Sequence, residues 1–259
     1  MLVLDAYCRF GPWSKRNPGQ PYDAGYVRRE HDKFHIVKGL CMSSESRFGV
    51  PELGNRAVAQ LSKEDPHFIP AWAGLGGRRF NAPSTSEFLE EARREGVGAV
   101  GLYPKTHGYP LREWVVGDLL DGMSRARLPL ILSWEEVEPD EIYRIGKLWP
   151  ELPVILCEVP YTAGRTLLPL VEENPNLHIC FAPRFIFTGF LEDFCCRYGP
   201  ERLLYGSALP EFSPGPLLSY VMYSRADEEA KELILGGNLL RLLRQVAWPV
   251  SGLSDLEGI

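Results

Sequence analysis

Two residues near the start of the chain could bind an anion where a strand ends. The segment LDAYCRFG, residues 4–11, begins as an apolar strand and carries Tyr7 and Arg9 two positions apart. Because side chains alternate along a strand, Tyr7 and Arg9 would point to the same face. A guanidinium keeps its charge in proteins and binds carboxylates or phosphates through paired hydrogen bonds. Arg9 could therefore bind a small anion, with Tyr7 donating a hydrogen bond.

A carboxylate later in the chain could complete this site. Glu158 lies near the end of the apolar run LPVILCEV, residues 152–159, and Asp5 lies two positions before Tyr7. An unpaired buried arginine would cost about 3–5 kcal/mol, so Arg9 is expected to pair with Glu158 or with Asp5. Two interpretations stay open. In the first, the Arg9–Glu158 pair is only structural. In the second, Arg9 binds a ligand while Glu158 acts as acid or base.

Other polar or aromatic residues follow predicted strands and are candidates for contact with the same ligand. They are Lys105, His107, Ser133, Trp134, Arg184 and Glu211. Lys105, His107, Arg184 and Glu211 could equally face solvent, and Trp134 could equally lie in the core. Glu135 and Glu136 are expected to begin the helix after the fifth strand, because acidic residues are common in a first helical turn.

Eight apolar runs, rich in Val, Ile, Leu and aromatic residues, predict the strands that would position these side chains. They are residues 3–8, 34–42, 68–75, 97–104, 128–134, 152–159, 177–183 and 202–210. Helical patterns lie between most of them, at residues 84–95, 111–127, 140–151, 164–175 and 190–201. Alternating strands and helices predict parallel βαβ units, and eight of them fit a single (β/α)8 TIM barrel over residues 1–259.

A doubly wound open sheet is the alternative, but it would normally show a glycine-rich phosphate turn after the first strand. Gly11, Pro12 and Trp13 do not form that motif. Two stretches fall outside the alternation. Residues 12–31 are expected to form a long loop on the face that carries the site, and residues 248–259 a C-terminal tail.

Three motifs resemble the amidohydrolase superfamily, in particular the amidohydrolase-2 group of metal-dependent TIM barrels related to aminocarboxymuconate semialdehyde decarboxylase. LDAYCRFG resembles the first strand of that group, Asp-Ala-His-x-His followed by Gly, and RLLYGSALP resembles its last strand, which carries Gly-Ser-Asp-x-Pro. ELILGGNLLRLL resembles its closing helix pair, in which a Gly-Asn turn precedes a Leu-rich helix. The resemblance implies a hydrolase or lyase that holds a divalent metal.

The same resemblance implies that the metal ligands have been replaced. The family's ligand positions fall on Tyr7, Arg9, Ser133, Glu158 and Ala208 in this chain, with Trp134 in place of Ser133 after a one-residue shift. We therefore expect no metal and no other cofactor, with a divalent metal as the alternative. The expected function is a non-catalytic or anion-binding homologue. The alternative is an active hydrolase or decarboxylase-like lyase on a small carboxylate, working without metal or with an atypical site.

Composition narrows the classes of partner. The chain has 28 Lys and Arg against 34 Asp and Glu, a net charge of -6, and no basic run, which argues against nucleic acid. No apolar stretch reaches the length of a membrane span. Six cysteines without metal-binding spacing are typical of buried thiols in a reducing compartment, so we expect a cytoplasmic protein. The resemblance adds an expected homodimer.

Overall fold

Eight parallel strands form the centre of the molecule. The computed structural model describes residues 1–12, 19–77, 83–186 and 188–256. Within them the strands are β1 Leu4–Phe10, β2 Lys38–Ser43, β3 Phe68–Gly74, β4 Ala99–Leu102, β5 Leu130–Ser133, β6 Val154–Cys157, β7 Leu177–Phe181 and β8 Leu203–Tyr205. Each strand pairs with the next in sequence order, and all of the pairs are parallel. This is the predicted set of eight strands.

The barrel closes between its last and first strands. The segment after β8 supplies the contacts, because the Ala208 amide donates to the Tyr7 carbonyl at 2.9 Å and the Arg9 amide donates to the Leu209 carbonyl at 3.0 Å. Gly206 permits this approach, since a Cβ on it would lie 2.3 Å from Cys180 Sγ and 3.3 Å from Tyr7 Cβ. The fold is therefore the (β/α)8 TIM barrel that the alternation predicts.

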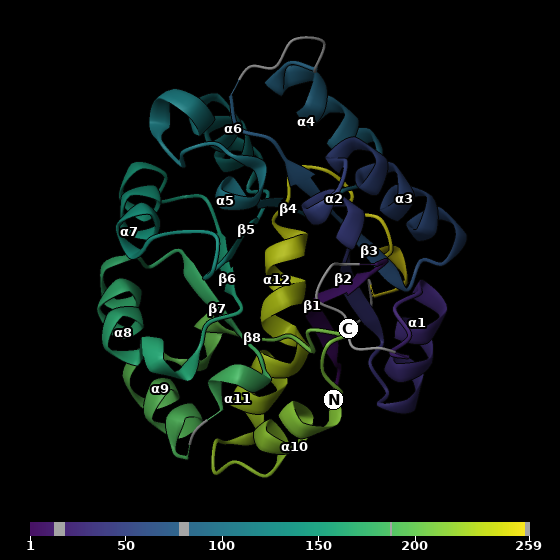
Figure 1. The fold of residues 1–259 in the computed structure, drawn as a ribbon. Coiled ribbons are helices and arrows are strands. Elements are labelled where there is room, and N and C mark those ends of the chain that lie inside the picture. The colour runs from purple at the N-terminus through teal and green to yellow at the C-terminus, as the bar shows by residue number, and fades with distance from the viewer. Residues whose placement is uncertain (13–18, 78–82, 187, 257–259) are drawn as a thin grey trace.

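Helices surround the strands, as Figure 1 shows. They are α1 Ala24–Lys33, α2 Ser44–Phe48, α3 Pro51–Glu64, α4 Thr85–Arg94, α5 Pro104–His107, α6 Glu113–Ala126, α7 Pro139–Leu148, α8 Gly164–Glu173, α9 Phe190–Tyr198, α10 Gly215–Met222, α11 Glu228–Glu232 and α12 Asn238–Arg244. The five helices predicted between strands correspond to α4, α6, α7, α8 and α9. Among the described helices, none is both long and apolar enough to cross a bilayer.

Three connections have structure that the sequence pattern does not predict. Helix α1 begins at Ala24, where the Asp23 side chain caps it, so the expected loop 12–31 is helical in its second half. Residues 13–18 of that stretch lie outside the described residues. In the stretch predicted as a C-terminal tail, Trp248 packs on the barrel, since its Nε1 donates to the Val97 carbonyl at 2.9 Å.

The third concerns the Gly-Asn turn. Gly237 and Asn238 have helical dihedral angles, and a π-helical turn, Leu233–Gly237, joins α11 to α12 without a break. A Cβ on Gly236 would lie 2.5 Å from the Leu2 carbonyl oxygen, so this glycine lets the helix approach the start of the chain. Asn238 is buried and donates to the Pro200 and Leu203 carbonyls. These contacts favour a continuous helix over a turn.

Candidate functional site at the carboxyl ends of the strands

The first strand turns Tyr7 and Arg9 into the barrel by means of an irregularity. The pairing of β1 with β2 shifts register between Asp5 and Cys8. A register shift of one residue moves the following side chains to the other face. Asp5 therefore faces α1, where its carboxylate contacts His31 Nε2 at 3.0 Å. The expectation that Asp5 shares a face with Arg9 is wrong for this reason.

Arg9 pairs with two carboxylates at the mouth of the barrel. Its Nη1 lies 3.6 Å from Glu158 Oε1, and its Nη2 donates to Glu211 Oε1. Glu158 comes directly after β6, and Glu211 follows β8 by six residues. The structure thus contains the Arg9–Glu158 ion pair that the sequence predicts, together with a second partner that the sequence did not single out for this pairing.

A second arginine enters from the segment after β2. Arg47, in α2, donates through Nη1 to Glu158 Oε2 at 2.9 Å and through Nη2 to Glu136 Oε1 at 3.1 Å. Both guanidinium groups are buried, with only 7–8% of each side chain exposed. We call Arg9, Arg47, Glu136, Glu158 and Glu211 the arginine–glutamate cluster. It joins the ends of β1, β2, β5, β6 and β8.

Glu136 and His107 hold Arg47 in place. Glu136 accepts hydrogen bonds from the backbone amide of Thr106 at 2.9 Å and from its hydroxyl at 2.5 Å, in addition to Arg47. His107 Nε2 contacts the Arg47 carbonyl at 3.0 Å. Helix α7 begins only at Pro139, with Glu138 as its cap. The expectation that Glu136 begins this helix is therefore wrong, because its carboxylate is used inside the site.

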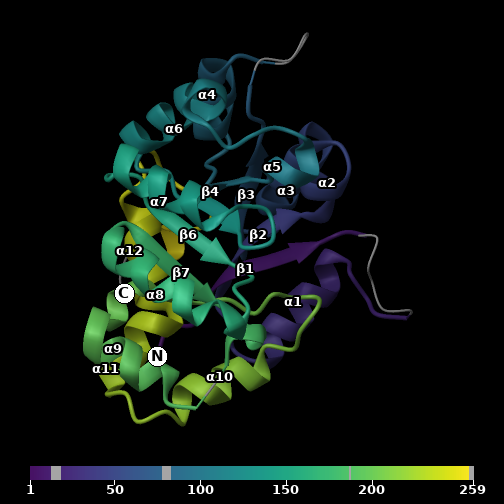
Figure 2. The same cartoon turned by 60° about the vertical axis from the view of Figure 1, so that its left-hand side comes forward.

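The short helices that carry these residues lie together beyond the strands. Figure 1 and Figure 2 both show α2 and α5 near the ends of β2, β3 and β4, and residues of the two helices contact one another. Tyr103 precedes α5 and is stacked on Arg47, with the guanidinium carbon 4.9 Å from the ring centre. Phe48 also lies against this guanidinium, with its ring centre 5.0 Å from the guanidinium carbon. The cluster is therefore enclosed by aromatic rings as well as by charges.

A small cavity lies beside the two arginines. Its lining residues are Tyr7, Arg9, Met42, Ser43, Ser44, Arg47 and Tyr103. Its volume of about 10 Å³ is room for about one water molecule. Ser44 Oγ and Arg47 Nε are buried, and neither has a hydrogen-bond partner among the described residues. Since buried polar atoms are normally satisfied, these two donors indicate a polar occupant.

Glu158 stays ionised in the cluster, and Tyr7 beside it stays protonated. Burial alone would raise the pKa of Glu158, but Arg47, the Ser133 hydroxyl and Arg9 offset this effect and hold the pKa below its usual value. Burial and the charge of Glu158 raise the pKa of Tyr7 well above its usual value. Glu158 is therefore a carboxylate at neutral pH, and Tyr7 is a neutral phenol that can donate a hydrogen bond.

The remaining predicted residues lie in three different settings. Ser133 is buried at the end of β5 and donates to Glu158. Trp134, next to it, is partly buried against the core. Lys105 and Arg184 point to the surface, where Lys105 pairs with Glu138 at 2.8 Å and Arg184 pairs with Glu135 at 3.2 Å. The structure does not bring Lys105 or Arg184 to the cluster.

A family model described as Amidohydrolase matches residues 45–245. The chain belongs to the amidohydrolase family. No curated protein matches it.

Solved structures of similar fold cover almost the entire chain. An uncharacterized TIM-barrel protein, Bb4693 from Bordetella bronchiseptica, is 18% identical over 95% of this chain and 99% of its own, with a TM-score of 0.70. A 2,6-dihydroxybenzoate decarboxylase from Rhizobium is 14% identical over 94% and 98%, with a TM-score of 0.70. A 5-carboxyvanillate decarboxylase from Sphingomonas paucimobilis is 11% identical over 94% and 99%, with a TM-score of 0.66. At these identities the likeness concerns the fold.

The residues at the expected metal positions of this amidohydrolase do not fit a divalent cation. They offer a phenol, a guanidinium, a hydroxyl, a carboxylate and a methyl group, from Tyr7, Arg9, Ser133, Glu158 and Ala208. Metal sites of this kind need several imidazole, thiolate or carboxylate ligands. The one carboxylate is instead bound by two arginines.

Glu158 and Ala208 both adopt positive φ angles, 58° and 55°, which are unfavourable for residues other than glycine and tend to occur at functional sites.

Within the described residues, one group with metal-ligand chemistry lies elsewhere. Ligand atoms of Asp5, Cys8 and His31 lie within 4.8 Å of one another, buried between β1 and α1. The Asp5 carboxylate already accepts hydrogen bonds from the backbone amides of Tyr7 and Ser207, the Ser207 hydroxyl and His31. His31 Nδ1 in turn contacts His67 Nε2 at 2.7 Å. The hydrogen bonds of Asp5 and His31 are those of a structural network.

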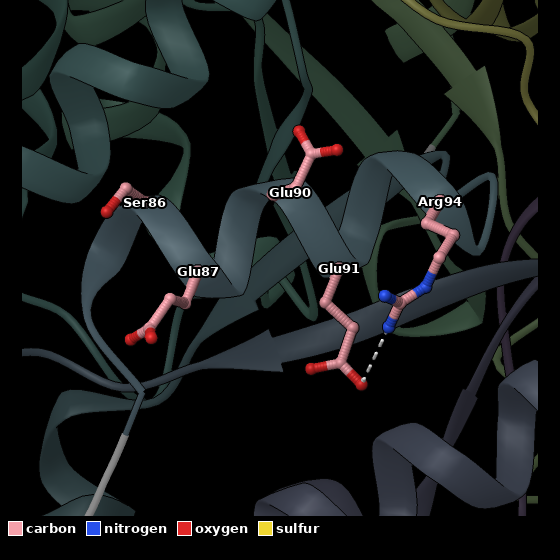
Figure 3. A pocket seen from close by; sticks show the side chains of 5 residues that line it. All are labelled: Ser86, Glu87, Glu90, Glu91 and Arg94. Carbon is pink, nitrogen blue, oxygen red and sulfur yellow. Dashed lines mark ion pairs between the residues drawn. The ribbon is translucent and has the colours of Figure 1, made fainter.

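A larger hollow of about 440 Å³ lies on the outer face of α4, away from the arginine–glutamate cluster. Figure 3 shows its lining, Ser86, Glu87, Glu90, Glu91 and Arg94, on a single helix. The hollow is open to solvent, and its one ion pair in this view, Glu91–Arg94, measures 3.8 Å. A surface row of acidic residues does not make a binding site, so we place the functional site in the barrel mouth.

Proposed function

We propose that this amidohydrolase hydrolyses a small carboxylate that carries a ring, at the arginine–glutamate cluster. The observation that carries the proposal is the pair of buried arginines beside a cavity with two unpartnered donors, Ser44 Oγ and Arg47 Nε. This arrangement lies at the carboxyl ends of the strands, where TIM-barrel enzymes have their active sites. Both arginines remain cations, so the site favours an anionic ligand.

The aromatic residues support a ligand with a ring. Phe48 lies against both arginines, 5.9 Å from the Arg9 guanidinium carbon and 5.0 Å from that of Arg47, and is 42% exposed. A planar ring could stack on its exposed face while a carboxylate contacts Arg9. Two solved structures of similar fold have substrates of this kind in their names, dihydroxybenzoate and carboxyvanillate. We extend that substrate class to this chain as part of the proposal.

Glu158 supplies the proton-transfer group for hydrolysis. As a carboxylate it takes a proton from a water molecule, whose oxygen then bonds to the carbonyl carbon of the substrate. The donors Ser44 Oγ and Arg47 Nε stabilise the negative charge that forms on the carbonyl oxygen. The bond to the leaving group breaks, and the leaving group takes the proton from Glu158. No step requires a metal.

The test is turnover of a panel of aromatic esters and lactones that carry a free carboxylate, followed by NMR. We expect hydrolysis to persist in the presence of a metal chelator. Glu158→Gln should lower kcat by about 100-fold or more, because the amide cannot accept the proton. Glu135→Gln, on the exposed Glu135–Arg184 pair, is the matched control and should leave kcat unchanged.

Two results would contradict the proposal. Loss of turnover with chelator would show that a metal is needed. Release of carbon dioxide from hydroxybenzoates, without ester hydrolysis, would show a decarboxylase-like lyase instead.

A second candidate is a non-catalytic anion-binding protein. It is favoured by the small volume of the cavity and by the glutamates that already bind Arg9 and Arg47. Binding of ring carboxylates without turnover of any member of the panel would support it.

A further inference from the structure

Glu211 differs from the other carboxylates of the cluster in its exposure. Its side chain is 24% exposed, against 13% for Glu158 and 5% for Glu136. Its only partner in the cluster is Arg9 Nη2, whereas Glu136 and Glu158 are each bound by several groups. Glu211 is therefore the carboxylate that can leave the cluster most easily.

The backbone around Glu211 is anchored while its side chain extends to Arg9. The Glu211 amide donates to the Ala208 carbonyl at 3.0 Å, and the Gln20 side-chain amide donates to the Pro210 carbonyl. Release of Arg9 thus needs only rotation of the Glu211 side chain. Arg9 would keep Glu158 as a counter-ion, with 3.6 Å between Nη1 and Oε1.

We propose that Glu211 occupies the place of the ligand carboxylate on Arg9 in the ligand-free protein, and that the ligand displaces it. This inference rests on the proposed function, because it concerns the same site. The exchange replaces one carboxylate by another on the same guanidinium edge, so the charge of the cluster is conserved. A neutral ligand would leave Arg9 with one counter-ion fewer, and the exchange therefore selects for carboxylates over their amides.

The exposed ring of Phe48 restricts the ligand further. It lies 5.9 Å from the Arg9 guanidinium carbon, so a carboxylate bound to the guanidinium edge would place an attached ring close to it. Aromatic monocarboxylates, with benzoate as the simplest, are the class that fits both contacts.

The test is isothermal titration of the whole chain with benzoate and with benzamide. In Glu211→Gln the side chain keeps its size but no longer competes as an anion, so benzoate should bind about tenfold more tightly than to the unaltered protein. Benzamide should bind weakly to both. Glu135→Gln, which removes one exposed negative charge elsewhere at the mouth, should leave benzoate affinity unchanged.

Equal or weaker benzoate binding to Glu211→Gln would overturn the inference, as would the absence of benzoate binding to both proteins. Glu211→Ala must shift the affinity in the same direction as Glu211→Gln. Binding is read independently of turnover, so a protein that binds benzoate as expected but hydrolyses nothing would refute the proposed function alone.

Discussion

At the scale of single residues, the site is organised by buried charges that neutralise one another. Glu158 receives contacts from Arg9, Arg47 and Ser133, and Arg47 connects it to Glu136. Each charge is stable in the interior only because its partners are present, since removal of one partner leaves an uncompensated buried ion. The stability of the site and its capacity to bind an anion therefore depend on the same side chains.

This dependence predicts a large effect for Arg47→Ala. The substitution leaves Glu136 and Glu158 without the guanidinium, and we expect a loss of about 3–5 kcal/mol in the free energy of unfolding. Urea denaturation followed by circular dichroism measures it. The control is Arg184→Ala, which breaks the exposed pair with Glu135 and should cost at most about 1 kcal/mol. Similar losses for both variants would contradict the buried-charge account.

At the scale of elements, two backbone features shape the mouth of the barrel. They are a register shift in β1 and a close approach of the chain at Gly206. The shift in β1 directs Asp5 outward and Arg9 inward. After β8, Gly206 lets the chain pass close to Cys180 and Tyr7. Both features act on the backbone, and together they decide which side chains reach the mouth.

Gly206→Ala should destabilise the barrel by overpacking. The new methyl group would lie 2.3 Å from Cys180 Sγ, and crowding of this kind typically costs about 1–3 kcal/mol. Cys180→Ala removes that sulfur and should restore much of the loss when it is combined with Gly206→Ala. Urea denaturation of the two single variants and the double variant gives the coupling energy. Additive losses would show that the clash with Cys180 is not the cause.

At the scale of the whole molecule, buried histidines make the fold sensitive to acid. Burial, together with the nearby charges of Arg241 and Arg202, lowers the pKa of His178, in β7, from 6.5 to about 4. Burial and the charge of His31 have the same effect on His67, which lies just before β3 and whose pKa is also about 4. These two neutral histidines lie in separate parts of the barrel, so the effect is global.

We therefore expect stability to fall as the pH decreases from about 6.5 to 4. In this range the unfolded chain binds a proton at His178 and the folded chain does not, so each such histidine contributes a slope of about 1.4 kcal/mol per pH unit. His178→Asn should reduce the slope of unfolding free energy against pH by that amount, measured by urea titrations at several pH values. The control is the same substitution at the exposed His35, His35→Asn. An unchanged slope in His178→Asn would contradict the prediction.

The sequence by itself determined the barrel and part of the site. Apolar runs alternating with amphipathic segments require parallel strands covered by helices, and this pattern is local enough to be read directly. The two-residue spacing of Tyr7 and Arg9 and the position of Glu158 after its strand also place them at the mouth. The ion pair Arg9–Glu158 follows from the cost of a buried charge.

Only the tertiary structure decided which other residues complete the site. Arg47 and Glu136 are 89 positions apart, and neither has a local pattern that distinguishes it from a surface residue. Their meeting depends on how β2 and β5 are placed around the barrel. The outward position of Asp5 depends on a register shift, which is a property of strand pairing. Long-range packing fixes such contacts, and alternation along a single segment carries no information about them.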